Sequence, residues 1–166
     1  FVRQLMNYTS QRANEVGSIK TIGGRKCRFN MWEPDTKGFH KAMPFDQANK
    51  EYGKHMALKR AFTYKALNRL IQGSAADQTK AAMVLLYKEG IIPHIQVHDE
   101  LDISVHDQQQ ANRIVEIMES SISLKVPNKV DAEYGANWGE AKTTFSEKPL
   151  TRGLSGNHSV QLVNED

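Results

Sequence analysis

The residues best suited to chemistry are two adjacent acids, Asp99 and Glu100, within residues 96–101, which read Gln-Val-His-Asp-Glu-Leu. Apolar and polar residues alternate on both sides of the pair, a pattern typical of two half-buried strands joined by a tight turn. Carboxylates repel each other, and such turns usually contain Asn-Gly or Asp-Gly, so folding alone explains the pair poorly. Carboxylates fixed at a sheet edge suit Mg²⁺, which binds one or two of them together with substrate phosphates.

Two other metal sites can be considered. A zinc site formed by His94, His98 and Asp99 is disfavoured, because histidines four apart on one strand are separated by about 13 Å of backbone. An unrelated metal-dependent phosphohydrolase would need more acids, at spacings that match no familiar pattern. Those further ligands would have to come from Asp77, Asp102 or Glu133.

The composition is that of a globular chain with a real core. It has 166 residues, of which 39% are hydrophobic and 25% charged. The single cysteine, Cys27, excludes an internal disulfide and a cysteine-based zinc site. No stretch approaches the ~18–20 apolar residues of a membrane span, and no secretion leader is apparent. We expect an intracellular setting, in the cytoplasm of a bacterial or host cell, with no membrane contact. The chain begins with Phe1 inside an expected helix, so we expect a piece of something longer or a trimmed product.

Charge is distributed unevenly along the chain. Residues 1–70 carry 14 basic and 5 acidic side chains, whereas residues 71–166 carry 8 basic and 14 acidic ones. A basic half suggests contact with a polyanion, and an acidic half that contains the carboxylate pair suggests cation binding. Chance segregation of charges on solvated faces explains the same pattern equally well.

The elements that must position these residues follow from periodicity and turn residues. We expect a helix over residues 1–16 closed by Gly17, a basic hairpin over 18–29 with a glycine turn, and a loop over 30–46. Helix formers dominate 47–71, and a second helix is expected from Ala75 to about Glu89, with Ser74 as its N-cap. The hairpin around Asp99 follows, then a helix over 108–124, a strand over 129–134 and a flexible tail. The predicted fold class is α+β, an antiparallel sheet with helices packed on one face.

Four segments resemble one protein family, the family A DNA polymerases. Residues 96–101 resemble its motif C, and residues 68–77 (Asn-Arg-Leu-Ile-Gln-Gly-Ser-Ala-Ala-Asp) resemble the stretch before that motif. Residues 21–26 resemble its Thr-x-x-Gly-Arg-Arg segment, and residues 135–138 its closing Gly-x-Asn-Trp. The four occur in the family's order and cover roughly residues 1–142. The sequence of residues 67–73 resembles that of phage members of the family.

The resemblance implies a domain assignment. Residues 1–46 would be the C-terminal part of the fingers. They would contain a helix, a basic hairpin and a loop, and would come before the sheet in the chain. Residues 47–142 would be a palm portion containing motif C, with a palm-type sheet, and residues 143–166 a flexible C-terminal tail. The family's first catalytic aspartate (motif A) and its nucleotide-binding fingers helix (motif B) would lie upstream of Phe1.

The implied function is that of a C-terminal fragment or subunit of a template-directed DNA polymerase, inactive without an upstream fragment or chain that carries motifs A and B. Its partners would be primer–template DNA and dNTP. Its cofactor would be Mg²⁺, two ions shared with the upstream segment. Asp99 would be a direct metal ligand, Glu100 a water-mediated one, and both are the candidate catalytic residues.

The resemblance also implies DNA contacts. His98 would contact the terminal sugar or phosphate of the primer, and Asn68 and Gln72 would read minor-groove acceptors shared by all correct base pairs. Some members carry an arginine where this chain has Tyr64, and Lys65 is the candidate replacement. Two sets of basic residues are suited to the phosphate backbone: Arg25, Lys26 and Arg28 on the hairpin, and Lys54, Lys59, Arg60, Lys65 and Arg69 on an expected helix. A non-catalytic nucleic-acid-binding module derived from a polymerase palm is the alternative, although such a module would not need an intact carboxylate pair.

Overall fold

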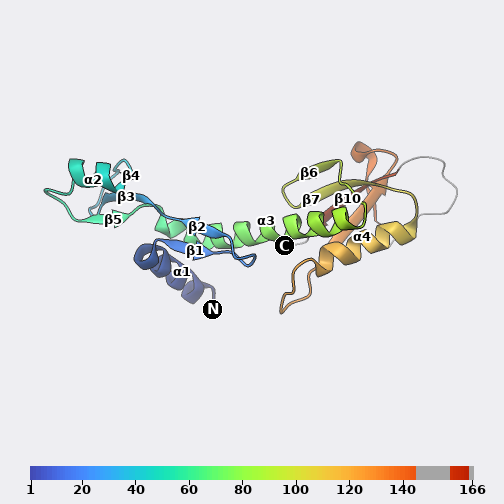
Figure 1. The fold of residues 1–166 in the computed structure, drawn as a ribbon, viewed down its shortest axis with the longest axis horizontal. Helices are drawn as coiled ribbons and strands as arrows, with labels where there is room; N and C mark the ends of the chain where they lie inside the picture. Colours follow the sequence, from blue (N-terminus) through green and yellow to red (C-terminus); the bar gives the residue numbers. More distant parts are fainter. Residues whose placement is uncertain (145–157, 165–166) are drawn as a thin grey trace. The chain divides into compact units, whose positions relative to one another are not determined.

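The computed structural model describes residues 1–144 and 158–164, with side chains described for residues 1–142. The chain forms two compact units, Phe1–Ser74 and Ala75–Asp166, and the boundary between them lies within one long helix, α3 (Ala66–Lys88). Figure 1 labels the elements. The division between a fingers part (residues 1–46) and a palm part (residues 47–142) is a separate assignment, and it stays a prediction.

The first unit begins with the expected helix and hairpin. Helix α1 (Val2–Val16) ends at Gly17, whose positive φ of 72° favours glycine and lets its N–H donate to the Ala13 carbonyl at 3.1 Å. Strands β1 (Ser18–Lys20) and β2 (Lys26–Arg28) pair antiparallel, as predicted. The small core beneath them consists of Ala13, Ile19, Phe29 and Ala66, with Cys27 and Leu70 packed against it.

The next segment corrects two expectations. Residues 30–46 were expected to be a loop and 47–71 helical. Helices do cover the two ends of the second range, in α2 and α3, but a three-stranded antiparallel sheet in the order β4-β3-β5 also forms in this segment. The strands of this sheet are β3 (Met31–Pro34), β4 (Met43–Pro44) and β5 (Leu58–Arg60). The same segment contains helix α2 (Phe45–Glu51) and a 3₁₀ turn, η1 (Thr63–Lys65). Helix formation is interrupted at Phe62, which has a φ of 62°. The pairing of β5 with β3 therefore overrides the local helix propensity.

Helix α3 corrects another expectation, because it runs without a break from Ala66 to Lys88 and Ser74 lies inside it. The Ser74 hydroxyl donates to the Leu70 carbonyl at 2.7 Å instead of capping a new helix. Gly73, which was expected to separate two helices, is accommodated in the helix interior, where the methyl group of Thr21 packs close to it.

The second unit contains a five-stranded antiparallel sheet in the order β6-β7-β10-β8-β9. Its strands are β6 (Ile95–Val97), β7 (Glu100–Val105), β8 (Val130–Gly135), β9 (Thr143–Thr144) and β10 (His158–Asn164). Helix α4 (Gln108–Ser120) connects β7 to β8, and a 3₁₀ turn, η2 (Trp138–Glu140), follows β8. Since β7 and β8 are both antiparallel to β10, they run parallel to each other.

A flexible tail was expected over residues 143–166, and strand β10 corrects that expectation for residues 158–164. Strand β10 occupies the middle of the sheet, where Val160 lies opposite both Ile103 of β7 and Tyr134 of β8. Residues 145–157 and 165–166 lie outside the described part of the chain.

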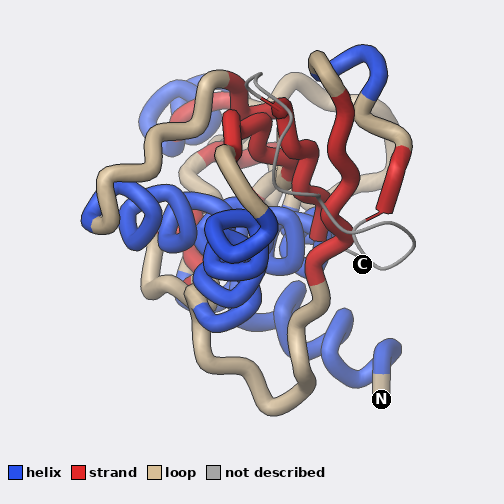
Figure 2. Tube along the Cα trace, turned by 90° about the vertical axis from the view of Figure 1, so that its right-hand side faces the viewer, coloured by secondary structure: helices blue, strands red, loops and turns tan. Residues whose placement is uncertain are grey.

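The core of the second unit forms between this sheet and two helices. Leu101, Ile103 and Val105 of β7 are completely or almost completely buried. Residues of both helices pack against this face, namely Ala82 and Leu86 of α3 and Ala111, Ile114, Ile117 and Met118 of α4. Figure 2 shows the helices beside the strands. The predicted α+β class with helices on one face of an antiparallel sheet is confirmed. No helix among the described residues is long and apolar enough to cross a membrane.

Candidate active site and nucleic-acid interface

The carboxylate pair lies at the tip of the β6–β7 hairpin, as the alternation predicts. Val97 pairs with Glu100, so His98 and Asp99 alone form the turn, while Glu100 begins β7. His98 is exposed, whereas Asp99 and Glu100 are each half-buried. A two-residue connection between paired strands holds both acids at a defined position, which a longer loop would not do.

The turn is strained at His98. Its φ is 52°, and only one other non-glycine residue in the described part of the chain, Phe62, has a positive φ. Two-residue hairpins that need a positive φ at the first turn position normally place glycine there. The side-chain amide of Gln96 donates to the His98 carbonyl and so supports the turn from β6. Strained residues of this kind cluster at functional sites.

A third acid follows on the same strand. Alternation along β7 places Asp102 on the same face as Glu100, opposite to the face of Leu101 and Ile103. Asp102 is only 8% exposed, and its Oδ1 has no hydrogen-bond partner among the residues that the structure describes. Burial raises the pKa of the Asp102 carboxyl, and the nearby charge of His94 partly offsets that rise. The backbone N–H of His94 donates to the Asp102 carbonyl oxygen at 2.8 Å.

The acids at the hairpin fit a partial magnesium site. Within the described residues, no group of three or more His, Cys, Asp or Glu side chains lies close enough to hold an ion by itself. Two neighbouring carboxylates still match the way Mg²⁺ binds, with one or two protein carboxylates and the remaining positions filled by phosphates and water. The zinc alternative gains no support, because His94 Nε2 instead lies 2.9 Å from Ser104 Oγ.

In the first unit, the turn of the basic hairpin is attached to α3 by three contacts. The N–H of Ile22 donates to Ser74 Oγ at 3.1 Å, and Arg25 Nη2 donates to the Gly73 carbonyl at 2.8 Å. A Cβ on Gly73 would lie 2.7 Å from the methyl carbon of Thr21, so only glycine permits this approach. One guanidinium nitrogen of Arg25, a predicted phosphate ligand, therefore holds the hairpin on the helix.

The predicted minor-groove residues lie together on α3. Asn68 and Gln72 are exposed and one helical turn apart, so they share a face, and exposed Lys65 lies just before the helix. The Arg69 guanidinium lies 4.9 Å from the ring centroid of Phe29, a stacking contact that fixes its orientation. Lys26 and Arg28 on β2 are exposed. Of the eight residues predicted to bind DNA, His98 belongs to the second unit and the other seven belong to the first.

Several residues that contribute to these sites were missed from the sequence. Gln96 supports the carboxylate turn, and Ser74 and Gly73 hold the basic hairpin. Asp102, a buried acid, was considered only as a ligand of an unrelated phosphohydrolase. The alternating pattern of residues 100–105 already contained the clue to Asp102, because an acid at its third position must share a face with Glu100. The contacts of Ser74 join residues 52 positions apart, and no local pattern reports them.

Comparison with known proteins agrees with the resemblance. The model of DNA polymerase family A matches residues 1–140. The DNA-directed DNA polymerase of Pseudomonas phage M6 is 40% identical over 141 residues, which are 85% of this chain and 18% of the phage protein. DNA polymerase I of Pseudomonas aeruginosa is 31% identical over 145 residues, covering 82% of this chain and 14% of that enzyme. DNA polymerase I of Bacillus caldotenax is 43% identical over 86 residues. The chain thus spans less than a fifth of the length of each of these relatives.

Proposed function

Because the chain belongs to DNA polymerase family A, we propose that it is the C-terminal part of a template-directed DNA polymerase. It contributes Asp99 and Glu100 to the nucleotidyl-transfer site and depends on an upstream segment for the remaining catalytic groups. The observation that carries the proposal is the adjacent carboxylate pair where a strained two-residue turn meets β7, within a region similar to DNA polymerases.

Asp99 and Glu100 are the residues that would hold Mg²⁺, together with an aspartate of the upstream segment. Two Mg²⁺ ions bound there would neutralise the leaving pyrophosphate and make the primer 3′-hydroxyl a better nucleophile. The chain's own contribution is positional. The hairpin fixes both carboxylates at one place on a sheet, and His98 at the turn is exposed to contact the terminal sugar or phosphate of the primer.

The first unit supplies the contacts to primer–template DNA. Lys26 and Arg28 lie on β2, Lys65 lies just before α3 and Arg69 lies in the first turn of α3. All four are suited to the phosphate backbone. Asn68 and Gln72 present amide donors from one helix face, and the minor-groove acceptors they would meet are common to every correct base pair. Such contacts test base-pair geometry without reading sequence, which suits an enzyme that copies any template.

Complementation tests this function. The full chain is mixed with the part of the Pseudomonas phage M6 polymerase that precedes the region matched here, and extension of a labelled primer is followed with dNTP and Mg²⁺. We expect extension with both parts and none with either part alone. Asp99→Asn should lower the rate by about 100-fold or more, the effect of removing one electrostatic stabiliser of a transition state.

Asp131→Asn is the matched control, because Asp131 is an exposed acid of the same sheet, on β8 rather than at the turn. Its extension rate should equal that of the unmodified chain. Salt-sensitive duplex binding without extension in any combination would instead support the non-catalytic binding module. Full activity of the Asp99→Asn variant would remove Asp99 from the metal site.

A further inference from the structure

The sheet of the second unit contains two parallel strands that a strand from later in the chain separates. Strands β7 and β8 run parallel, because each pairs antiparallel with β10, and helix α4 connects them. A helix that connects parallel strands is the usual crossover of a βαβ unit. Strand β10 lies between the two strands of this unit, although it follows β8 and β9 in the sequence. The middle of the sheet is therefore completed by an element from outside the βαβ unit.

The order of the elements shows which strand this position takes in a known motif. From α3 to β8 the chain reads helix, strand, strand, helix, strand, namely α3, β6, β7, α4 and β8. The ferredoxin-like motif has the order β-α-β-β-α-β with split βαβ units, so the second unit reproduces its last five elements. In that motif the first strand lies between the third and the fourth. The corresponding position in this sheet is the one between β7 and β8, where β10 lies.

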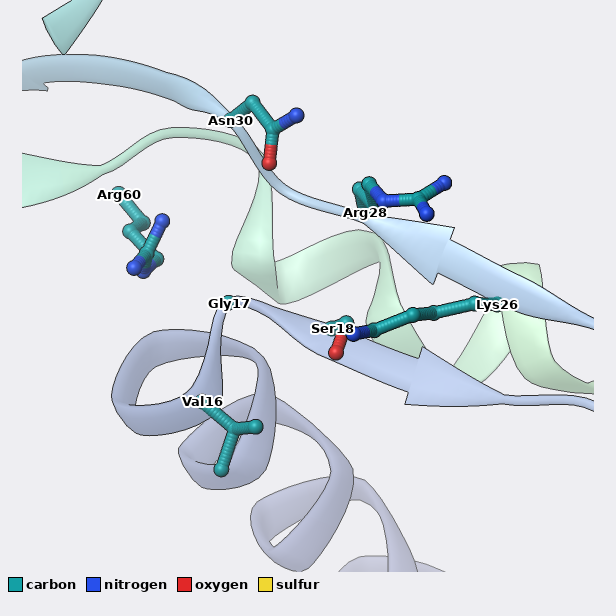
Figure 3. Close-up of a pocket in the computed structure, with 7 residues that line it drawn as sticks. All are labelled: Val16, Gly17, Ser18, Lys26, Arg28, Asn30 and Arg60. Atoms are coloured by element: carbon teal, nitrogen blue, oxygen red, sulfur yellow. The ribbon is translucent and has the colours of Figure 1, made fainter.

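The strands of the first unit do not take that position. Strands β1 and β2 pair with each other, as Figure 3 shows for the strand with Ser18 and the strand with Lys26 and Arg28. Strands β3, β4 and β5 form the separate sheet β4-β3-β5. None of the described strands that precede α3 thus belongs to the five-stranded sheet. The first strand of the motif has to come from another segment, and the upstream segment of the proposed function would precede α3 as the motif requires.

The match to the polymerase family includes both neighbours of this position but not β10. It covers residues 1–140, which contain β7 and β8, whereas β10 begins at His158. We propose that β10 occupies, in the chain alone, the position of a strand that the upstream segment supplies, and that the two parts associate by exchanging β10 for that strand. This inference rests on the proposed function, which requires an upstream segment, and it names the place where that segment binds.

The pairing of β10 shows where the exchange begins. On the β8 side its residues 159–164 are paired, whereas on the β7 side the pairing covers residues 158–162 and ends opposite Leu101. Val163 and Asn164 therefore pair with β8 alone. This weakly held end of β10 lies toward the turn that carries Asp99, two residues before Leu101. A strand that enters from this end brings groups of the upstream segment to the candidate metal site first.

Exchange keeps the backbone of the sheet paired. Pairing of an extended segment with the main chain of neighbouring strands is an established mode of recognition, and it includes complementation by a donor strand. The hydrogen bonds that β10 gives up are replaced by those of the incoming strand, so the net cost is small. Strand β10 thus completes the sheet of the free chain and slows its assembly with the upstream segment.

The first test locks β10 in place and repeats the complementation assay. Ser104→Cys is combined with Ser159→Cys, because the two residues lie opposite each other in β7 and β10. Opposite residues of an antiparallel pair have Cα atoms about 4.5 or 5.5 Å apart, which a disulfide can span. The matched control combines Glu133→Cys with Thr144→Cys, which links β8 to β9 and leaves β10 free to move.

Each double variant is assayed oxidised and after reduction, so that its reduced form reports any effect of the substitutions themselves. Thiol titration establishes that the disulfide has formed, with Cys27 as the remaining thiol. We expect the oxidised β7–β10 variant to extend primer at least about 10-fold more slowly than its reduced form, because a disulfide strongly disfavours opening of the segment that it closes. The β8–β9 control should extend equally in both forms. Full extension with β10 locked would overturn the exchange.

Hydrogen exchange of the unmodified chain provides a second test that needs no substitution. The backbone amides of residues 158–164 are followed by mass spectrometry with and without the upstream part of the Pseudomonas phage M6 polymerase. We expect these amides to lose protection when the upstream part binds, while residues 101–105 and 130–135 keep theirs. Unchanged protection of residues 158–164 in an active complex would contradict the inference.

The outcomes separate this inference from the proposed function. If primer extension occurs with β10 locked or still protected, strand exchange is wrong and the proposed function stands. If the unmodified chain gives no extension and forms no complex with the upstream part in size-exclusion chromatography, the proposed function fails, and the exchange fails with it. A complex in which residues 158–164 lose protection but no primer is extended would support the exchange and remove the catalytic part of the proposed function.

Discussion

The Ser74 hydroxyl accepts a hydrogen bond from the backbone N–H of Ile22 at 3.1 Å while donating to the Leu70 carbonyl one helical turn back. One side chain thus connects the turn of the basic hairpin to the interior of α3. The connection joins the face of α3 that carries Asn68 and Gln72 to the hairpin that carries Lys26 and Arg28, the residues of the proposed DNA interface.

We expect Ser74→Ala to destabilise the first unit by about 1 kcal/mol, since the Ile22 N–H loses its protein partner. Urea unfolding followed by Trp fluorescence measures the change. Ser120→Ala is the control, because Ser120 also donates to the carbonyl four residues earlier, that of Glu116, without receiving a distant N–H. Equal losses in the two variants would show that the link to Ile22 contributes nothing.

His98→Gly is expected to stabilise the chain. A left-handed backbone costs a non-glycine residue about 1–2 kcal/mol, and glycine removes that cost at a φ of 52° while adding some entropy to the unfolded state. The free energy of unfolding should therefore rise by up to about 1 kcal/mol, and extension in the complementation assay should fall. His98→Ala, which keeps the strain, should leave stability unchanged or lower it. A gain in stability for Ala equal to that for Gly would show that the strain is not at this residue.

Gly135→Ala is expected to be severely destabilising, by about 2 kcal/mol or more. A Cβ at this position would lie 2.4 Å from the carbonyl carbon and oxygen of Glu140, which are backbone atoms that cannot move aside. Gly139→Ala provides the comparison, because its Cβ would meet only Asn137 Oδ1, at 3.5 Å. Differential scanning calorimetry should show a large fall in Tm for the first variant and little change for the second. A small effect at Gly135 would contradict the described path of residues 135–141.

Asp102 should make the stability of the fold depend on pH. Burial raises the pKa of Asp102 in the folded chain above the ordinary 3.8, the value expected for the unfolded chain. At a pH between the pKa of the unfolded chain and that of the folded chain, Asp102 is protonated in the folded chain and ionised in the unfolded chain. Stability contributed at this residue therefore falls as pH rises through the window and stays low above it. Asp102→Asn should be more stable than the unmodified chain at pH 7, by about 1 kcal/mol, and the difference should disappear below the ordinary pKa. Urea unfolding at a series of pH values measures it, and a constant difference would exclude the titration of Asp102.

The local patterns of the sequence predict the two hairpins that carry candidate site residues, because each hairpin forms between neighbouring segments of the chain. Alternation on both sides of Asp99 predicts the β6–β7 hairpin, and the Gly23-Gly24 turn predicts the basic hairpin. Errors occur where distant residues decide the structure. The sequence predicts a helix break at Gly73, but in the structure Thr21 packs against this glycine inside a continuous helix. The sequence predicts helix for residues 58–60, but in the structure they pair with β3. No residue type or motif near Phe62 in the sequence predicts its positive φ.

The position of β10 has a consequence for the boundaries of any shortened version of this chain. The match to the polymerase family ends at residue 140, so the strand between β7 and β8 is supplied from outside the matched region. A chain that stops at residue 144 would split the sheet into two ribbons, β6–β7 and β8–β9, each with an open edge of unpaired backbone groups. Those edges face the same gap and run in the same direction, so they form a receptor for one extended antiparallel strand of another polypeptide. Ending the chain at residue 144 would therefore convert a continuous sheet into one that can bind a strand of another polypeptide in its middle.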